Sequence, residues 1–179
     1  MLLCRALLIA GLSLLFIGCS SINPISGGAA PQVLAEGPET WRAQGRFAYA
    51  DEEDRQNGQF DWRQRGSNYQ VRLFGPLGMG SVSIIGSADK VEIQSGEQSY
   101  FSTQPDLLFF ELTGMHIPIA ELSLWMTGKV REENQTGEWQ ILFDQYQEVG
   151  EFQLPSRIDL ENSQSSMRIA VSEWSLNLD

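Results

Sequence analysis

Apolar and polar residues alternate along most of the chain from Trp41 onward. A period of two with one apolar face is typical of strands that are buried on one side only. We therefore expect short strands at residues 45–50, 60–62, 69–73, 82–84, 91–93, 139–143, 151–154, 157–160 and 167–174. Turn signals such as Gln56-Asn57-Gly58 and Ser95-Gly96 separate them at short intervals. This spacing favours antiparallel hairpins, because a parallel pair needs a long crossover connection.

The alternation stops after Thr103, where a dense apolar block predicts a short helix over residues 106–112. Thr103 and Asp106 resemble a capping pair, and Gly114 fits a helix end. Pro118 is expected to begin a second helix that ends at Gly128. Its apolar positions fall at helical spacing: Ile119, Leu122, Trp125 and Met126. The pattern predicts a mainly β protein, an antiparallel barrel or curved sheet with a helical insert.

The N-terminus has a basic residue, Arg5, followed by an apolar run over residues 6–17 and then Gly18-Cys19. This order is typical of a secretory signal peptide. A cysteine directly after the small residue makes the segment resemble the lipobox of bacterial lipoproteins, with Phe16 where leucine is usual. That resemblance implies a diacylglyceryl group on the Cys19 thiol and cleavage before Cys19. An uncleaved anchor is the alternative, although a bilayer span needs roughly 20 apolar residues.

These features divide the chain into three parts. Residues 1–18 are the expected signal peptide, residues 19–39 a lipidated N-terminus with a flexible linker, and residues 40–179 a single folded domain. A linker rich in Gly, Pro and Ser spans roughly 25 Å on average. Cys4 and Cys19 are the only cysteines, so no disulfide is expected in the mature chain. Ser20, rather than Asp, follows Cys19, and by resemblance to proteobacterial lipoproteins this indicates the outer membrane.

Acidic residues dominate the charge of the chain. The net charge is −11, and removal of Arg5 with the signal peptide makes it −12. Nucleic-acid binding needs a basic surface, so this composition argues against it. It argues equally against electrostatic docking on anionic lipids.

The residues that could support catalysis or metal binding are few. His116 is the only histidine, which is too few for a histidine metal site or a Ser-His-Asp triad. The acidic residues 51–54 lack the ligand spacing of a calcium loop and fit a solvated turn. The glycine-rich residues 75–81 lack the Gly-Lys-Ser/Thr ending of a phosphate loop. We expect neither an enzyme nor a cofactor or metal, apart from the lipid on Cys19.

Apolar residues occupy the tip between two predicted strands, in Gly75-Pro76-Leu77-Gly78-Met79. Proline and glycine at these positions suit a type I turn, whose tip is usually polar. Leu77 and Met79 are therefore candidates for a membrane-insertion loop. The alternative is that the tip folds back and buries Leu77 against the body.

The arrangement of motifs resembles the LolB family, the outer-membrane lipoprotein receptors of Gram-negative bacteria. The shared pattern covers residues 41–174. It consists of Gly45-Arg46-Phe47-Ala48-Tyr49, Phe60-Asp61-Trp62, Tyr69-Gln70-Val71-Arg72-Leu73, Pro76-Leu77-Gly78, Leu112-Thr113-Gly114-Met115-His116-Ile117-Pro118, Leu122, Trp125-Met126, Gly128, Leu154-Pro155-Ser156-Arg157-Ile158 and Arg168-Ile169 with Trp174.

The resemblance implies an incomplete antiparallel β-barrel with a helical lid over an apolar cavity. It implies a monomeric body on the periplasmic side of the outer membrane that accepts acylated lipoproteins from a LolA-like carrier and inserts them into outer-membrane lipid. Leu77 corresponds to the family's protruding apolar loop residue. The candidate cavity residues are Phe47, Trp62, Leu73, Ile84, Phe109, Leu112, Met115 and Trp125.

Alternation alone does not distinguish a cavity lining from a solid core. Two other functions also stay open from the residues. One is a carrier or binding lipoprotein for another hydrophobic ligand, and the other is an envelope scaffold that binds no lipid.

Overall fold

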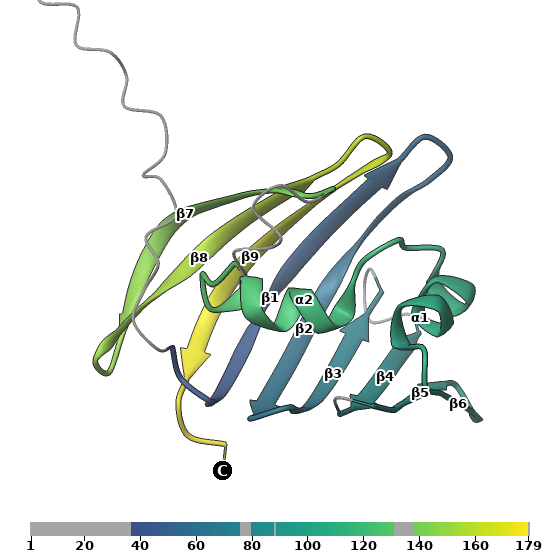
Figure 1. Ribbon diagram of the computed structural model, residues 1–179, viewed down its shortest axis with the longest axis horizontal. Coiled ribbons are helices and arrows are strands. Elements are labelled where there is room, and N and C mark those ends of the chain that lie inside the picture. Colours follow the sequence, from purple (N-terminus) through teal and green to yellow (C-terminus); the bar gives the residue numbers. More distant parts are fainter. Residues whose placement is uncertain (1–36, 76–79, 88, 131–137, 179) are drawn as a thin grey trace, which may run out of the picture.

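Nine antiparallel strands form one open sheet in the computed structural model, which describes residues 37–75, 80–87, 89–130 and 138–178 (Figure 1). Their spatial order is β6-β5-β4-β3-β2-β1-β9-β8-β7. The strands are β1 (Thr40–Asp51), β2 (Arg55–Arg65), β3 (Asn68–Phe74), β4 (Ser81–Gly86), β5 (Val91–Ser95), β6 (Gln98–Ser102), β7 (Gln140–Val149), β8 (Phe152–Glu161) and β9 (Ser165–Ser175). The prediction of a mainly β, incomplete antiparallel barrel is confirmed.

Strand β1 shows how the alternation creates two faces. Trp41, Ala43, Gly45, Phe47 and Tyr49 are buried, whereas the residues that alternate with them point to the outer face. The same period continues through β2, β3 and β9, which places their apolar residues on one side of the sheet. The hydrophobic core therefore lies along the inner, concave face.

Two short helices cover that inner face: α1 (Pro105–Thr113) and α2 (Ile119–Met126). Helix α2 crosses in front of the central strands, and α1 lies over the side formed by β4, β5 and β6 (Figure 1). Helix α1 ends where Gly114 takes φ 74°, and the Gly114 N–H bonds the Phe110 carbonyl at 2.7 Å. Glycine suits this left-handed C-terminal position, as the sequence predicted.

The helix starts differ from the sequence prediction. Thr103 and Asp106 do not form a capping pair, because Gln104 is the N-cap residue and no side chain caps it within the described part of the chain. The Asp106 carboxylate instead accepts a hydrogen bond from the Ile119 N–H at 2.9 Å. Asp106 thus ties the start of α1 to the start of α2.

Three strand predictions also need correction. Strand β6 was not predicted, because Gln98–Ser102 has no apolar alternation and Phe101 is 73% exposed. Residues 56–58 lie within β2 instead of a turn. Gly58 is needed there because an added Cβ would lie 2.4 Å from the Phe74 carbonyl oxygen.

The third correction concerns β8, which was expected as two strands interrupted at Pro155. It is one strand, and its pairing with β9 begins only at Arg157. Pro155 therefore leaves no gap in that ladder despite its missing N–H. The Pro155 carbonyl accepts a hydrogen bond from Trp174 Nε1 at 3.1 Å, which fixes the strand at this point.

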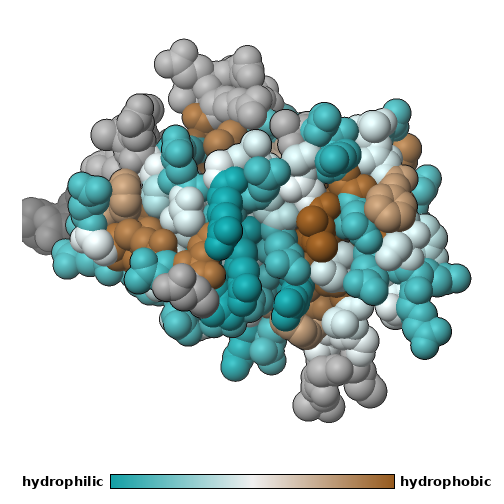
Figure 2. Space-filling view, turned by 90° about the horizontal axis from the view of Figure 1, so that it is seen from below, coloured by the Kyte–Doolittle hydropathy of each residue, from teal (hydrophilic) through white to brown (hydrophobic). Residues whose placement is uncertain are grey.

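The surface combines hydrophilic and isolated apolar side chains. Seen from the end of the sheet at which β1 begins, a band of hydrophilic side chains has apolar side chains on either side (Figure 2). Over the described surface as a whole the large exposed apolar residues are Ile85, Phe101, Leu107, Leu142 and Tyr146. They come from β4, β6, α1 and β7, and single exposed apolar residues are ordinary on proteins.

On the outer face, Asp61 is held by Arg42 across β1 and β2. Arg42 Nε and Nη2 donate to its two carboxylate oxygens at 2.9 and 2.6 Å. These hydrogen bonds, more than the opposing effect of burial, lower the pKa of the Asp61 carboxyl. The pair therefore stabilises the folded chain when Asp61 is ionised.

We expect Asp61→Asn to lower the free energy of unfolding at pH 7 by about 1–2 kcal/mol. A lowered folded-state pKa means that this stabilisation is present above the unfolded-state pKa and is lost as the pH falls through the folded-state pKa. Urea unfolding of the parent chain and of Asp61→Asn at decreasing pH measures the difference in their free energies of unfolding, and this difference should shrink in acid. Glu97→Gln, at the exposed β5–β6 turn, is the control and should change little. If the difference in free energy of unfolding did not change with pH, it would contradict the stabilisation of the fold by ionised Asp61 paired with Arg42.

Candidate functional site

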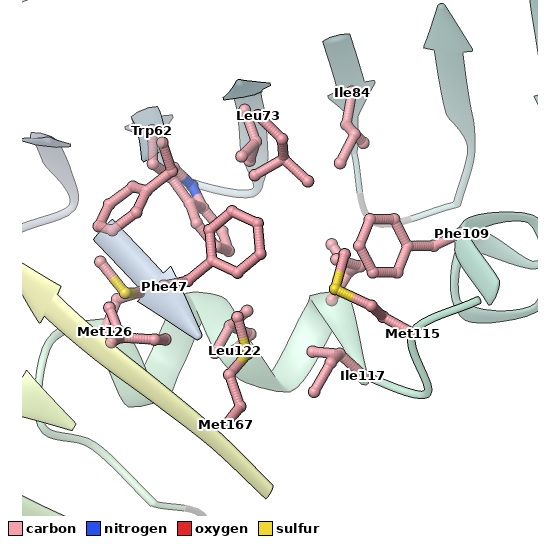
Figure 3. Close-up of a pocket in the computed structure, with 14 residues that line it drawn as sticks. Phe47, Trp62, Leu73, Ile84, Phe109, Met115, Ile117, Leu122, Met126 and Met167 are labelled. Carbon is pink, nitrogen blue, oxygen red and sulfur yellow. The ribbon is translucent and has the colours of Figure 1, made fainter. Parts of the chain in front are cut away.

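An apolar cavity of about 40 Å³ lies between the sheet and the helices (Figure 3). All of its lining residues are hydrophobic: Phe47, Phe60, Trp62, Val71, Leu73, Ile84, Phe109, Met115, Ile117, Ile119, Leu122, Met126, Met167 and Ile169. A space of this size has room for a few waters, since one water needs about 10–15 Å³. Such a fully apolar space favours hydrocarbon over water.

The lining comes from both layers of the fold. Trp62, Leu73 and Ile84 point inward from neighbouring strands of the sheet, and the Phe47 ring lies among them (Figure 3). Phe109 comes from α1, and the segment between the helices adds Met115 and Ile117. The α2 residues Ile119, Leu122 and Met126 complete the opposite wall at spacings of three and four, which places them on one helix face.

Six of the eight residues proposed from the sequence lie together around this cavity: Phe47, Trp62, Leu73, Ile84, Phe109 and Met115. Leu112 lies one helical turn beyond Phe109 and lines the neighbouring open pocket instead. Trp125 is buried outside the lining, where its ring centroid is 6.1 Å from that of Trp139. Consecutive residues on a helix point in different directions, so Met126 faces the cavity and Trp125 does not. Contact of any of these residues with acyl chains stays a prediction.

Eight lining residues were not among the sequence candidates. Phe60 and Val71 carry a usable signal, because each lies two positions from a candidate on the same strand face. Met167 and Ile169 are part of the cavity lining because β9 pairs with β1, where Phe47 lies opposite Ile169. That pairing joins distant parts of the chain, so no local pattern indicates it. The remaining four are Ile117, Ile119, Leu122 and Met126, on or beside α2.

Polar contacts hold the helical layer to the sheet near the cavity. Gln56 Nε2 donates to the Thr113 carbonyl at 2.8 Å, and the His116 N–H donates to the Tyr49 hydroxyl at 3.3 Å. Burial raises the pKa of Tyr49, and it raises the pKa of Tyr69 to about 12. Both phenols are therefore neutral at physiological pH and act as hydrogen-bonding or packing groups.

The polar residues singled out in the sequence have structural contacts. The His116 ring stacks on Phe110 with centroids 3.7 Å apart. Asp51 Oδ1 accepts the N–H groups of Glu53 and Asp54 at 2.9 and 2.7 Å, which forms the β1–β2 turn and lowers the pKa of Asp51. Cys19, Leu77 and Met79 lie outside the described residues, so their roles stay predictions.

Comparison with known proteins connects this architecture to a family. The family model described as "Outer membrane lipoprotein LolB" matches residues 39–174. These residues include both helices, the described cavity lining and the nine strands apart from Ser175, the last residue of β9. The chain belongs to the LolB family. The resemblance deduced from the sequence is therefore confirmed.

Individual LolB relatives match nearly the whole chain. The outer-membrane lipoprotein LolB of Halorhodospira halophila is 30% identical over 96% of this chain and 96% of its own length. That of Alkalilimnicola ehrlichii is 28% identical, covering 95% and 96%. Among solved structures, a DUF1329 family protein from Desulfovibrio piger has a TM-score of 0.53 at 7% identity, covering 80% of this chain and 88% of that one, which indicates a similar fold alone.

Within the described ranges, no helix of this LolB family chain has the length and hydropathy needed to cross a bilayer.

Proposed function

We propose that this chain is an outer-membrane-anchored receptor that accepts acylated lipoproteins from a LolA-like periplasmic carrier and inserts them into the outer membrane. The observation that carries this proposal is the wholly apolar cavity beneath two helices in a chain of the LolB family. Its relatives are named outer-membrane lipoproteins, which supports the same location for this chain. The body would then face the periplasm.

Transfer through such a cavity needs no covalent chemistry, nucleotide or cofactor. An acyl chain leaving water gains about 0.8 kcal/mol per methylene, so cargo must move between sheltered sites. Transfer proceeds downhill if affinity for the chains rises from carrier to receptor to bilayer. The cavity is far smaller than a long acyl chain, so acceptance requires the helical layer to move away from the sheet.

The N-terminal segments complete the proposal. Residues 1–18 act as the signal peptide, Cys19 carries the lipid, and residues 19–39 tether the domain of residues 40–179. Tethering raises the concentration of receptor at its target membrane. Family membership favours this receptor over a carrier of another lipid or a scaffold without a ligand.

Leu77→Glu is expected to reduce delivery of lipoprotein to membranes by about tenfold or more, while acceptance from the carrier is retained. Burial of one leucine in lipid yields about 1.5–3 kcal/mol, and a carboxylate loses that gain. The measurement is transfer of a labelled lipoprotein from loaded carrier to receptor and then to vesicles. Leu107→Glu is the matched control, because Leu107 is an exposed leucine on α1. Delivery by Leu77→Glu at the parent rate would refute the role of this loop, and failure of the parent to accept cargo would refute the receptor proposal.

A further inference from the structure

An open pocket of about 720 Å³ adjoins the apolar cavity at one end of the sheet. The two spaces share Phe47, Leu73 and Met115 as lining residues. The pocket extends outward past Leu112 at the end of α1 and past Ser95 at the end of β5. The three shared side chains therefore lie where the apolar cavity meets a pocket that is open to solvent.

A second open pocket, of about 1050 Å³, is larger and is lined by the β1–β2 hairpin together with β7, β8 and β9. Among the described residues it shares Met167 alone with the cavity. Its described lining has five charged residues, Arg55, Arg157, Asp159, Glu161 and Arg168, whereas that of the first pocket has Arg55 alone. An acyl chain passing there would have to displace water from charged groups, which is costly. The pocket of about 720 Å³, which shares three apolar residues with the cavity, is therefore the more favourable route for an acyl chain into the cavity.

One of the three shared residues, Met115, lies in a short segment just after the end of α1. Met115 faces both spaces, and it follows Thr113 and Gly114. Gln56 Nε2 donates to the Thr113 carbonyl at 2.8 Å and to Asp54 Oδ2 at 3.0 Å, so β2 holds this segment in the closed position. Gln56 itself lines the pocket.

We propose that this pocket is the entrance through which acyl chains reach the cavity, and that Gln56 keeps it closed by bonding Thr113. Opening releases the Thr113 carbonyl and swings Met115 aside, which joins the two spaces. The pocket lining mixes apolar residues with polar ones, which include Arg55, Gln56, Asn57 and Ser95. This mixture suits the polar ester and amide end of an acylated peptide, whose chains then enter the cavity. The inference rests on the receptor proposal, because it assumes an acylated ligand.

Two substitutions test the entrance. Every described strand, helix and core residue lies after residue 39, so the chain from residue 20 onward keeps the whole folded body and is the one tested.

Ser95→Trp should narrow the pocket and slow association of a fluorescent acylated peptide with this chain at least about fivefold. Gln94→Trp is its control, on the adjacent exposed residue of the same strand that points to the outer face. Gln56→Leu should speed association about two- to tenfold, the factor typical of one hydrogen bond, and Gln59→Leu on the outer face of β2 should not.

Stopped-flow fluorescence gives the association rates, and urea unfolding confirms that each variant is folded. If Ser95→Trp is unfolded, the Gln56→Leu and Gln59→Leu pair still decides the question. Parent-like rates for both Ser95→Trp and Gln56→Leu would overturn the entrance while leaving the receptor proposal intact. Absence of acyl-peptide binding by the parent chain would instead refute the receptor proposal.

Discussion

Replacing Gly45 with valine is expected to abolish the fold, with a loss of at least about 3 kcal/mol in the free energy of unfolding. An added Cβ at Gly45 would lie 2.1 Å from the Ala170 carbonyl oxygen and 2.9 Å from Cε1 of Phe60. The first contact is with backbone, which does not yield without breaking the ladder. Gly45 also lies where the register between β1 and β9 shifts, at the join between the two halves of the sheet. Urea unfolding, or yield of soluble chain, measures the effect.

Gly66→Ala is the control for this prediction. Gly66 has φ 55°, but an added Cβ would meet no atom within 4 Å. The cost is then backbone strain alone, about 1–2 kcal/mol. Equal stabilities for the two variants would show that the close approach of β1 to β9 does not constrain the sheet.

Cys19→Ser is expected to abolish incorporation of labelled palmitate into the chain, whereas Cys4→Ser should leave it unchanged. In the proposed anchor the Cys19 thiol accepts a diacylglyceryl group, whose acyl chains carry the label, and a hydroxyl does not replace the thiol. The two cysteines are the only ones in the chain, so each variant is the other's control. Labelling of cells that produce each variant, followed by isolation of the chain, gives the result.

The consequence for location follows from the same anchor. Two or more acyl chains give durable attachment, so a chain exported without Cys19 should move from the membrane to the soluble fraction. It should still accept cargo, because the cavity lies wholly in the body, but deliver it with less preference for the outer membrane. Continued palmitate labelling of Cys19→Ser, or loss of cargo acceptance without the anchor, would contradict the division between tether and body.

Strand alternation made the inner face of the sheet predictable from local sequence. Phe47, Trp62, Leu73 and Ile84 were identified because each repeats at a spacing of two, and the structure brings them together. Strand β6 escaped prediction because its side chains lack that alternation and it lies at the sheet edge. An edge strand can be specified by hairpin pairing alone, without an apolar face.

The helical layer was less predictable. An apolar residue on a short helix can face the cavity or another part of the core, as Met126 and Trp125 do on adjacent positions. Asp106 suggested a helix cap in the sequence, yet it bonds a residue that follows 13 positions later. Which way a helix residue faces, and which group Asp106 bonds, depends on contacts between separate elements. The periodicity within one element carries no information about those contacts.

In the proposed mechanism acyl chains occupy the cavity beneath α2, and Trp62 offers a direct reporter because it lines that space. Titration of the chain from residue 20 with a peptide carrying a brominated acyl chain should quench tryptophan fluorescence saturably. The quenching should be largely lost in Trp62→Phe and retained in Trp139→Phe, since Trp139 lies outside the lining. Absence of saturable quenching, or equal quenching in Trp62→Phe and the parent, would contradict acyl binding in this cavity.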